Sequence, residues 1–106
     1  MQSSLAAINH PHRRAILRLV WDAELSSRAI ASNFDVTWQA VSHNLRVLKE
    51  AGLVSERREG TRRLYRADRV GLGPLEEVLT AMWRQDLENL DDVIARDQAS
   101  GGSGDS

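Results

Sequence analysis

The 106-residue sequence contains no cysteine, so disulfide bonds, thiol catalysis, thiol redox sensing and thiolate metal sites are all excluded. No apolar run approaches the roughly 18 residues that a membrane-spanning helix needs, and the N-terminus lacks a signal-peptide pattern. Nothing pairs a nucleophile with a base, and there is no glycine-rich phosphate loop, so we expect neither an enzyme nor a cofactor. These absences favour a cytoplasmic, non-enzymatic protein of one domain without a membrane partner.

The chain also lacks an overall basic excess, because its formal net charge at pH 7 is −1. The charges are nevertheless distributed unevenly. Residues 1–36 carry +1, residues 37–70 carry +4 and residues 71–106 carry −6. A polyanion such as nucleic acid would be attracted to the middle of the chain and repelled by its end.

Hydrophobic periodicity predicts a mostly α-helical fold with one β-hairpin. We expect helices over residues 5–9, 11–22, 28–33, 38–51 and 75–97, and strands over residues 53–58 and 62–66. The expected N-caps of the three middle helices are His10 or Asn9, then Ser26, then Thr37. Two helices joined by a short turn and followed by a β-ribbon are typical of a winged helix-turn-helix.

We assign residues 1–97 to this winged helix-turn-helix domain, for which the three features described next indicate DNA binding and dimerisation. The remaining residues, 98–106, are rich in glycine and serine, and we expect them to be a disordered tail.

On a helical wheel of about 100° per residue, helix 38–51 separates into an apolar face and a hydrogen-bonding face. The hydrogen-bonding face and its cap supply the predicted DNA contacts Thr37, Gln39, Ser42, His43, Arg46 and Lys49. Arg46 suits guanine, Gln39 suits adenine, and the helix start at Thr37 suits a phosphate. A merely solvated face is the alternative, but the basic hairpin that follows argues against it. Asn44 falls on the buried arc and needs a hydrogen-bond partner.

The hairpin contains five arginines and no lysine. Four of them are predicted DNA contacts: Arg57, Arg58, Arg62 and Arg63. In a wing such side chains lie along the phosphate backbone or enter the minor groove. A charged edge that prevents strand aggregation is the alternative, but it explains one or two charges rather than five arginines.

The last helix carries an apolar stripe that is too long for a small domain to cover, which indicates a second copy of the chain. The predicted dimer interface comprises Leu5, Ile8, Leu75, Val78, Leu79, Met82, Trp83, Asp86 and Leu90. A two-fold axis would place two recognition helices one DNA turn apart on a palindromic operator. Asp86 lies within the stripe, where it either pairs with an arginine across the interface or belongs to a ligand-sensing or register-sensing site.

Three segments, HPHRRAILRLV, VTWQAVSHNLRVLKEAGLV and RREGTRRLYRAD, together resemble the ArsR/SmtB family of winged-helix repressors. The resemblance covers roughly residues 5–95, with the segments in the family's order and spacing. It implies a homodimeric bacterial repressor that dimerises through its first and last helices. Family members often respond to metals and release DNA when the effector binds.

The sequence departs from the metal-sensing members of that family. Those members place cysteines near the position of Ser26 and Ser27, or Asp, His and Glu ligands on the last helix. This chain has no cysteine, and its last helix has no histidine. His10 and His12 flank Pro11 and are too few to close a zinc shell. The resemblance is therefore to the metal-independent members, and no metal ligand is expected.

Three functions stay open at this point. The leading hypothesis is a sequence-specific DNA-binding repressor without a metal. The second is a sensor of the same fold that binds a small-molecule effector near Trp21, Trp83 and Asp86. The third is a winged-helix module for protein–protein contact, which would not need so many wing arginines and would show little salt-dependent DNA affinity.

Overall fold

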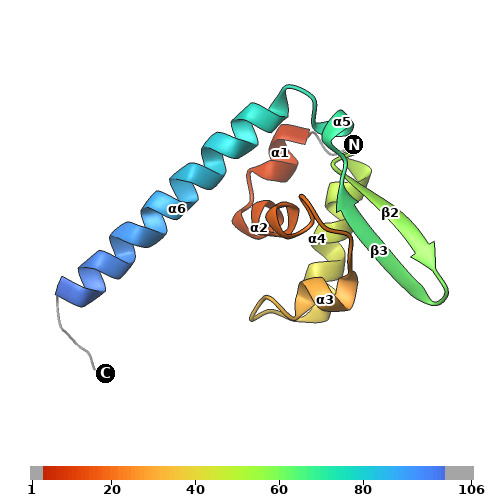
Figure 1. Ribbon diagram of the computed structural model, residues 1–106, viewed down its shortest axis with the longest axis horizontal. Coiled ribbons are helices and arrows are strands. Elements are labelled where there is room, and N and C mark those ends of the chain that lie inside the picture. The colour runs from red at the N-terminus through yellow and green to blue at the C-terminus, as the bar shows by residue number, and fades with distance from the viewer. Residues whose placement is uncertain (1–3, 100–106) are drawn as a thin grey trace. The chain divides into compact units, whose positions relative to one another are not determined.

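The computed structural model describes residues 4–99, and the surroundings of side chains as far as residue 88. Its elements, labelled in Figure 1, are α1 (Ser4–Ile8), α2 (Pro11–Leu19), β1 (Leu25–Ser26), α3 (Ser27–Ala31), α4 (Trp38–Glu50), β2 (Val54–Glu59), β3 (Arg62–Ala67), α5 (Arg69–Leu72) and α6 (Leu75–Ala99). The chain divides into two compact units, residues 1–76 and residues 77–106, which are described separately. Within the first unit, the winged helix-turn-helix predicted from the sequence is confirmed.

Two elements escaped the sequence analysis. Strand β1 is only two residues long, and it pairs antiparallel with β3 to give a three-stranded sheet in the order β1-β3-β2. Helix α5 has four residues and is capped by Asp68, whose carboxylate accepts a hydrogen bond from Gly71 N. Both elements are too short for periodicity to reveal. Of the predicted tail, residues 100–106 lie outside the described residues, whereas α6 continues to Ala99.

Each of the three middle helices begins at a capping side chain, as the sequence predicts. Ser26 Oγ accepts a hydrogen bond from Ala29 N and Thr37 Oγ1 accepts one from Ala40 N, both at 3.1 Å. His10 Nδ1 accepts one from His12 N, so this nitrogen must be unprotonated. Burial and the neighbouring charge of Arg13 lower the pKa of His10, which favours that neutral form.

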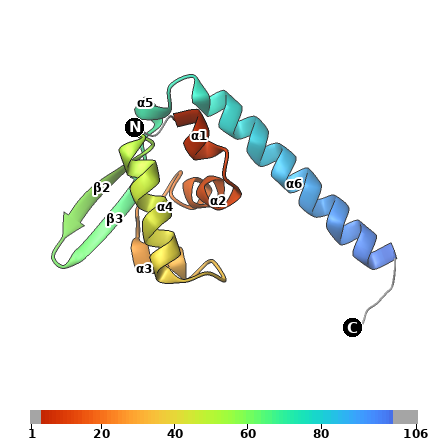
Figure 2. The ribbon, with the colours of Figure 1, turned by 180° about the vertical axis from the view of Figure 1, so that it is seen from behind.

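The core of the first unit lies where α2, α3 and the base of the hairpin meet α4. Figures 1 and 2 show α4 running beside α2, with α3 crossing near the N-terminal end of α4. Fully or almost fully buried apolar side chains fill this space: Ile16, Leu17, Val20, Ile30, Val41, Leu45, Leu48 and Leu53. The apolar face that the wheel assigns to helix 38–51 is therefore the face that α4 buries.

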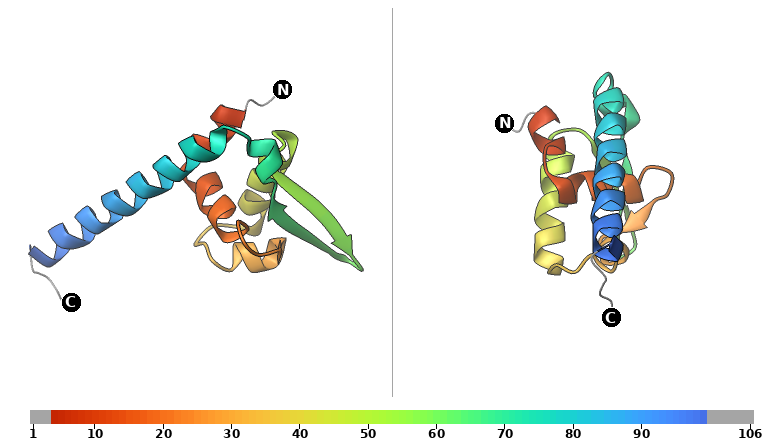
Figure 3. Two further views of the ribbon diagram at one scale, coloured as in Figure 1. Left: turned by 45° about the horizontal axis from the view of Figure 1, so that its top comes forward. Right: turned by 90° about the vertical axis from the view of Figure 1, so that its left-hand side faces the viewer.

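Strands β2 and β3 form the wing, which projects away from the helices of this unit (Figure 3). Glu59 and Arg62 form the last pair, so the loop between them contains only Gly60 and Thr61. Gly60 has a φ of 64°, a left-handed conformation that glycine adopts without strain. At the other end, Asp68 N donates to Leu53 O at 2.8 Å and fastens the base of the hairpin.

The side chains of Arg13 and Arg14 on α2 turn back onto α1, although Arg13 and Arg14 lie outside the apolar stripe of their helix. Arg13 Nε donates to Ala7 O at 2.7 Å, and Arg14 Nη1 donates to Ile8 O at 2.9 Å. These are among the last carbonyls of α1, which a five-residue helix cannot satisfy by itself. Arg13 Nη1 also donates to the side-chain oxygen of Asn44 at 3.2 Å. The buried Asn44 thus has its partner, and Arg13 joins α1, α2 and α4.

We predict that Asn44→Ala lowers the free energy of unfolding by about 1–3 kcal/mol, because it removes a hydrogen bond at a side chain that is only 8% exposed. Urea denaturation followed by circular dichroism at a fixed protein concentration measures the change. Gln39→Ala, at an exposed position of the same helix, is the control and should stay within about 0.5 kcal/mol of wild type. Equal stability of the two variants would contradict a structural role for the Arg13–Asn44 bond.

Candidate nucleic-acid interface

A cleft of about 750 Å³ lies between α4, α3 and the wing. Five cationic side chains line it: Arg28, Arg46, Lys49, Arg62 and Arg63. They come from three separate elements of the sequence, and the fold brings them to one concave surface. Ser42 and Thr61 add hydroxyl groups to the lining. The surface therefore offers charge for phosphates and hydrogen-bonding groups for base edges.

The predicted polar face of α4 divides into two parts. Ser42, Arg46 and Lys49 line the cleft. Gln39 and His43 are exposed on α4 but do not belong to the lining of the cleft. Thr37 is also exposed, and its hydroxyl oxygen is already used in capping.

Glu56 on β2 is a polar hub at the base of the cleft, with a side chain only 16% exposed. Lys49 Nζ donates to Glu56 Oε1 at 2.5 Å, and Tyr65 Oη donates to Glu56 Oε2 at 2.9 Å. Arg63 Nη1 lies 3.6 Å from the same Oε2. The hydrogen bond from Lys49, followed by that from Tyr65, lowers the pKa of Glu56 below its ordinary value of 4.5. The carboxylate is therefore ionised at pH 7 and holds two of the cleft's cations.

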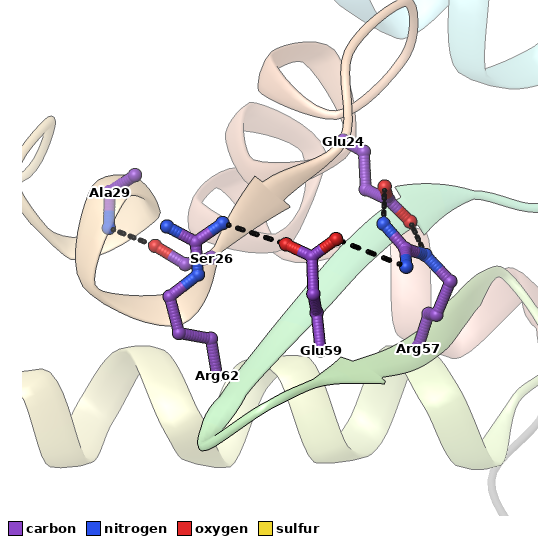
Figure 4. Close-up of polar contacts among 6 residues, drawn as sticks. All are labelled: Glu24, Ser26, Ala29, Arg57, Glu59 and Arg62. Atoms are coloured by element: carbon purple, nitrogen blue, oxygen red, sulfur yellow. Dashed lines mark hydrogen bonds and ion pairs between the residues drawn. The ribbon is translucent and has the colours of Figure 1, made fainter.

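A second chain of ion pairs runs along the wing (Figure 4). Arg57 Nη2 and Nε bind the carboxylate of Glu24 at 2.7 and 3.0 Å. Arg57 Nη1 also lies 3.5 Å from Glu59, and Glu59 lies 3.3 Å from Arg62. The hydrogen bond from Arg57 lowers the pKa of Glu24, and the same contact raises the pKa of Arg57. Arg57 is a predicted DNA contact, and in the structure its guanidinium already binds the carboxylate of Glu24, while half of its side chain stays exposed.

Arg58 and Arg63 are directly opposite each other on the two strands of the wing. Together with Lys49 and Glu56 they line a smaller hollow of about 300 Å³ beside the cleft. Like charges opposite one another destabilise a strand pair. The pair therefore concentrates positive charge at this position of the wing.

One cation of the cleft was not among the DNA contacts predicted from the sequence. This is Arg28, which lies on α3, the first helix of the helix-turn-helix. The first helix of this motif crosses the DNA backbone in known docking geometries, and that rule was the signal that could have found it.

The predicted dimer residues differ in exposure within one chain. Leu5 and Val78 are 55% and 39% exposed. Leu87, which borders the apolar stripe but is not among the predicted interface residues, is 57% exposed. Ile8, Leu79 and Trp83 have little exposed surface. Leu75, Met82 and Asp86 are half-buried, and the side chain of Leu90 lies outside the described residues. The interface as a whole stays a prediction.

No group of three His, Cys, Asp or Glu side chains within the described part of the chain could hold a metal ion. No helix there is both long and apolar enough to cross a membrane. The effector site that was predicted near Trp21, Trp83 and Asp86 draws on both units, and it too stays a prediction.

The profile of a helix-turn-helix domain family matches residues 8–57, which include α2, α3 and α4. Among curated proteins, the HTH-type transcriptional regulator Rv2034 of Mycobacterium tuberculosis is 38% identical over 82 residues, 77% of each chain. The transcriptional repressor SdpR of Bacillus subtilis is 35% identical over 60 residues, 57% of this chain and 67% of SdpR.

Solved structures give the same result. A crystal structure of a possible transcriptional regulator for arsenical resistance is 34% identical, with a TM-score of 0.69, over 87% of this chain and 96% of that chain. An ArsR-like transcriptional regulator from Rhodococcus sp. RHA1 is 25% identical, with a TM-score of 0.60, over 93% and 91%. With the helix-turn-helix, the arginine-rich wing and the cationic cleft between them, these likenesses place the chain in the ArsR-type family of winged helix-turn-helix, DNA-binding transcriptional regulators.

Proposed function

We propose that this regulator is a homodimeric repressor that binds a palindromic operator in double-stranded DNA and needs no metal. The observation that carries the proposal is the shared cleft, in which Arg46 of the recognition helix α4 and Arg62 and Arg63 of the wing line one surface. Repression is supported by the likeness to SdpR, which is a transcriptional repressor. Metal independence is supported by the absence of cysteine from the sequence.

The residues divide into two roles in this proposal. Arg46, Gln39, Ser42 and His43 project from α4 into the major groove and read base edges. Phosphates are bound by the helix start at Thr37, by Lys49 and by the wing arginines Arg58, Arg62 and Arg63. Arg57 acts through Glu24 and fixes the position of the wing.

Two-fold symmetry completes the proposed site, because one recognition helix reads only half of an operator. The support is the apolar stripe of α6, because Val78 on this stripe and Leu87 at its border are both exposed in the single chain. We place the contact on α1 and α6, through the residues predicted from the sequence.

We expect Arg46→Ala to cost roughly 1–3 kcal/mol per half-site on the best operator and much less on random DNA, because a lost base contact removes discrimination. Binding to a library of operator variants by fluorescence anisotropy measures this. Arg62→Ala is the matched control. It should weaken all sequences alike and flatten the salt dependence of log K by about one unit per lost phosphate contact. A uniform loss for Arg46→Ala, with base preferences unchanged, would make Arg46 a phosphate contact instead.

Glu56→Gln should raise the affinity for random DNA. The amide no longer competes with phosphates for Lys49 and Arg63, and the salt dependence should steepen by about one unit for each cation that gains a phosphate. Glu50→Gln makes the same change in net charge at an exposed position at the end of α4. If the two variants gain equally in a salt titration, the effect comes from net charge and the hub at Glu56 plays no part.

Static light scattering at micromolar concentration should give the mass of a dimer. Val78→Glu with Leu87→Glu should give a monomer and weaken operator binding, because each half-site loses its tethered partner. Both side chains are exposed in the single chain, so the protomer itself should stay folded. Ala81→Glu with Arg84→Gln changes the net charge equally on the opposite face of α6 and should remain dimeric. A monomeric wild-type protein would overturn the proposed assembly.

A further inference from the structure

Trp38 is an unusual side chain for its position. All five Phe, Tyr and Trp residues lie among the described residues. Trp38 is 51% exposed, whereas the other four are buried or half-buried. It occupies the first position of α4, directly after the capping residue Thr37. The capping bond from Ala40 N to Thr37 Oγ1 forms without the indole ring. Helix formation therefore gives no reason for a large apolar side chain in water at this place.

The surroundings of Trp38 point toward a ligand surface. The side chain lines the cationic cleft on one side, and on the other it lines a hollow of about 420 Å³ with Arg28, Ala31 and Ser32. The indole ring therefore borders both the cationic cleft and the smaller hollow. Ser42 and Arg46 follow Trp38 at i+4 and i+8, on the same face of α4, and both line the same cleft. A duplex seated on Ser42 and Arg46 would therefore also meet the indole at the end of the same face.

We propose that Trp38 is a specificity-determining residue that packs its indole ring against the C5-methyl group of a thymine in the major groove of the operator. This inference rests on the proposed role of α4 as the base-reading helix. The thymine methyl is the apolar group that base edges display in the major groove, and apolar side chains recognise it by contact. The arginines and lysine around Trp38 match the charge of a DNA backbone rather than that of another apolar surface.

A sugar–phosphate contact is the competing role for the exposed indole, and it makes a different prediction. Packing against the backbone would be insensitive to the base beside it. Replacing thymine by deoxyuridine removes the methyl group alone and leaves base pairing, the phosphates and the hydrogen-bonding edge unchanged. The two roles can therefore be separated without altering the protein.

The experiment uses the full chain and the best duplex selected from a random DNA pool, with each thymine replaced in turn by deoxyuridine. Replacing one particular thymine of each half-site should lower the affinity of wild type about fourfold. This is the change in affinity expected when one buried methyl-sized group is lost. Trp38→Ala should bind the thymine duplex more weakly and show no further loss at that position. Trp38→Phe, which keeps an aromatic face, should retain part of the sensitivity. Val70→Ala, at a 93% exposed apolar position on α5, is the control and should retain all of it.

Equal affinity of wild type for every deoxyuridine duplex would overturn the inference, as would an equal methyl effect in wild type and Trp38→Ala. The proposed function would still stand in that case if the selection enriches one DNA sequence and Arg46→Ala changes which sequence is preferred. Failure of the selection to enrich any sequence would instead reject sequence-specific reading, and the role of Trp38 with it.

Discussion

The packing of one face of α4 is the constraint on which the binding surface depends. Val41, Leu45 and Leu48 are buried against the rest of the core, and burial of each such side chain contributes roughly 1.5–3 kcal/mol. A rotation of the helix would expose these side chains, so the opposite face has a fixed direction. The hydrogen bond between Arg13 and Asn44 adds a polar restraint in the same apolar layer, where an unpaired amide is costly. The exposed position of Arg46 thus follows from what α4 must hide.

Acidic residues decide which of the many cations remain available on this surface. Glu56 lies at the base of the cleft and holds Lys49, with Arg63 close by. Glu24 accepts hydrogen bonds from Nε and Nη2 of Arg57 on β2. A count of arginines along the chain treats all of them as equivalent. The structure separates those that face a carboxylate at close range from those, such as Arg46 on α4, that line the cleft in the company of hydroxyl groups.

Much of this architecture could be predicted because it depends on local signals. The helical period of α4, its cap Thr37 and the glycine turn at Gly60 act over a few residues, and all three appear as expected. The pairs Arg13–Asn44, Arg57–Glu24 and Lys49–Glu56 could not be predicted, since the first two join residues more than 30 positions apart and all three depend on how α4 and the strands are placed. The two-residue strand β1 was missed for the same reason, because only β3 defines it.

The ion pairs along the wing also have an entropic consequence. A long arginine side chain loses rotamer freedom when it is immobilised at an interface, and that loss reduces affinity. Arg62, a proposed phosphate contact, already pairs with Glu59 in the unbound chain, and Arg57 pairs with Glu24 beside it, so part of this ordering accompanies folding. The direction of the wing and the conformation of some of its side chains are therefore fixed before a duplex binds. Preorganisation of this kind slows dissociation more than it speeds encounter, which suits a protein whose task depends on how long it stays.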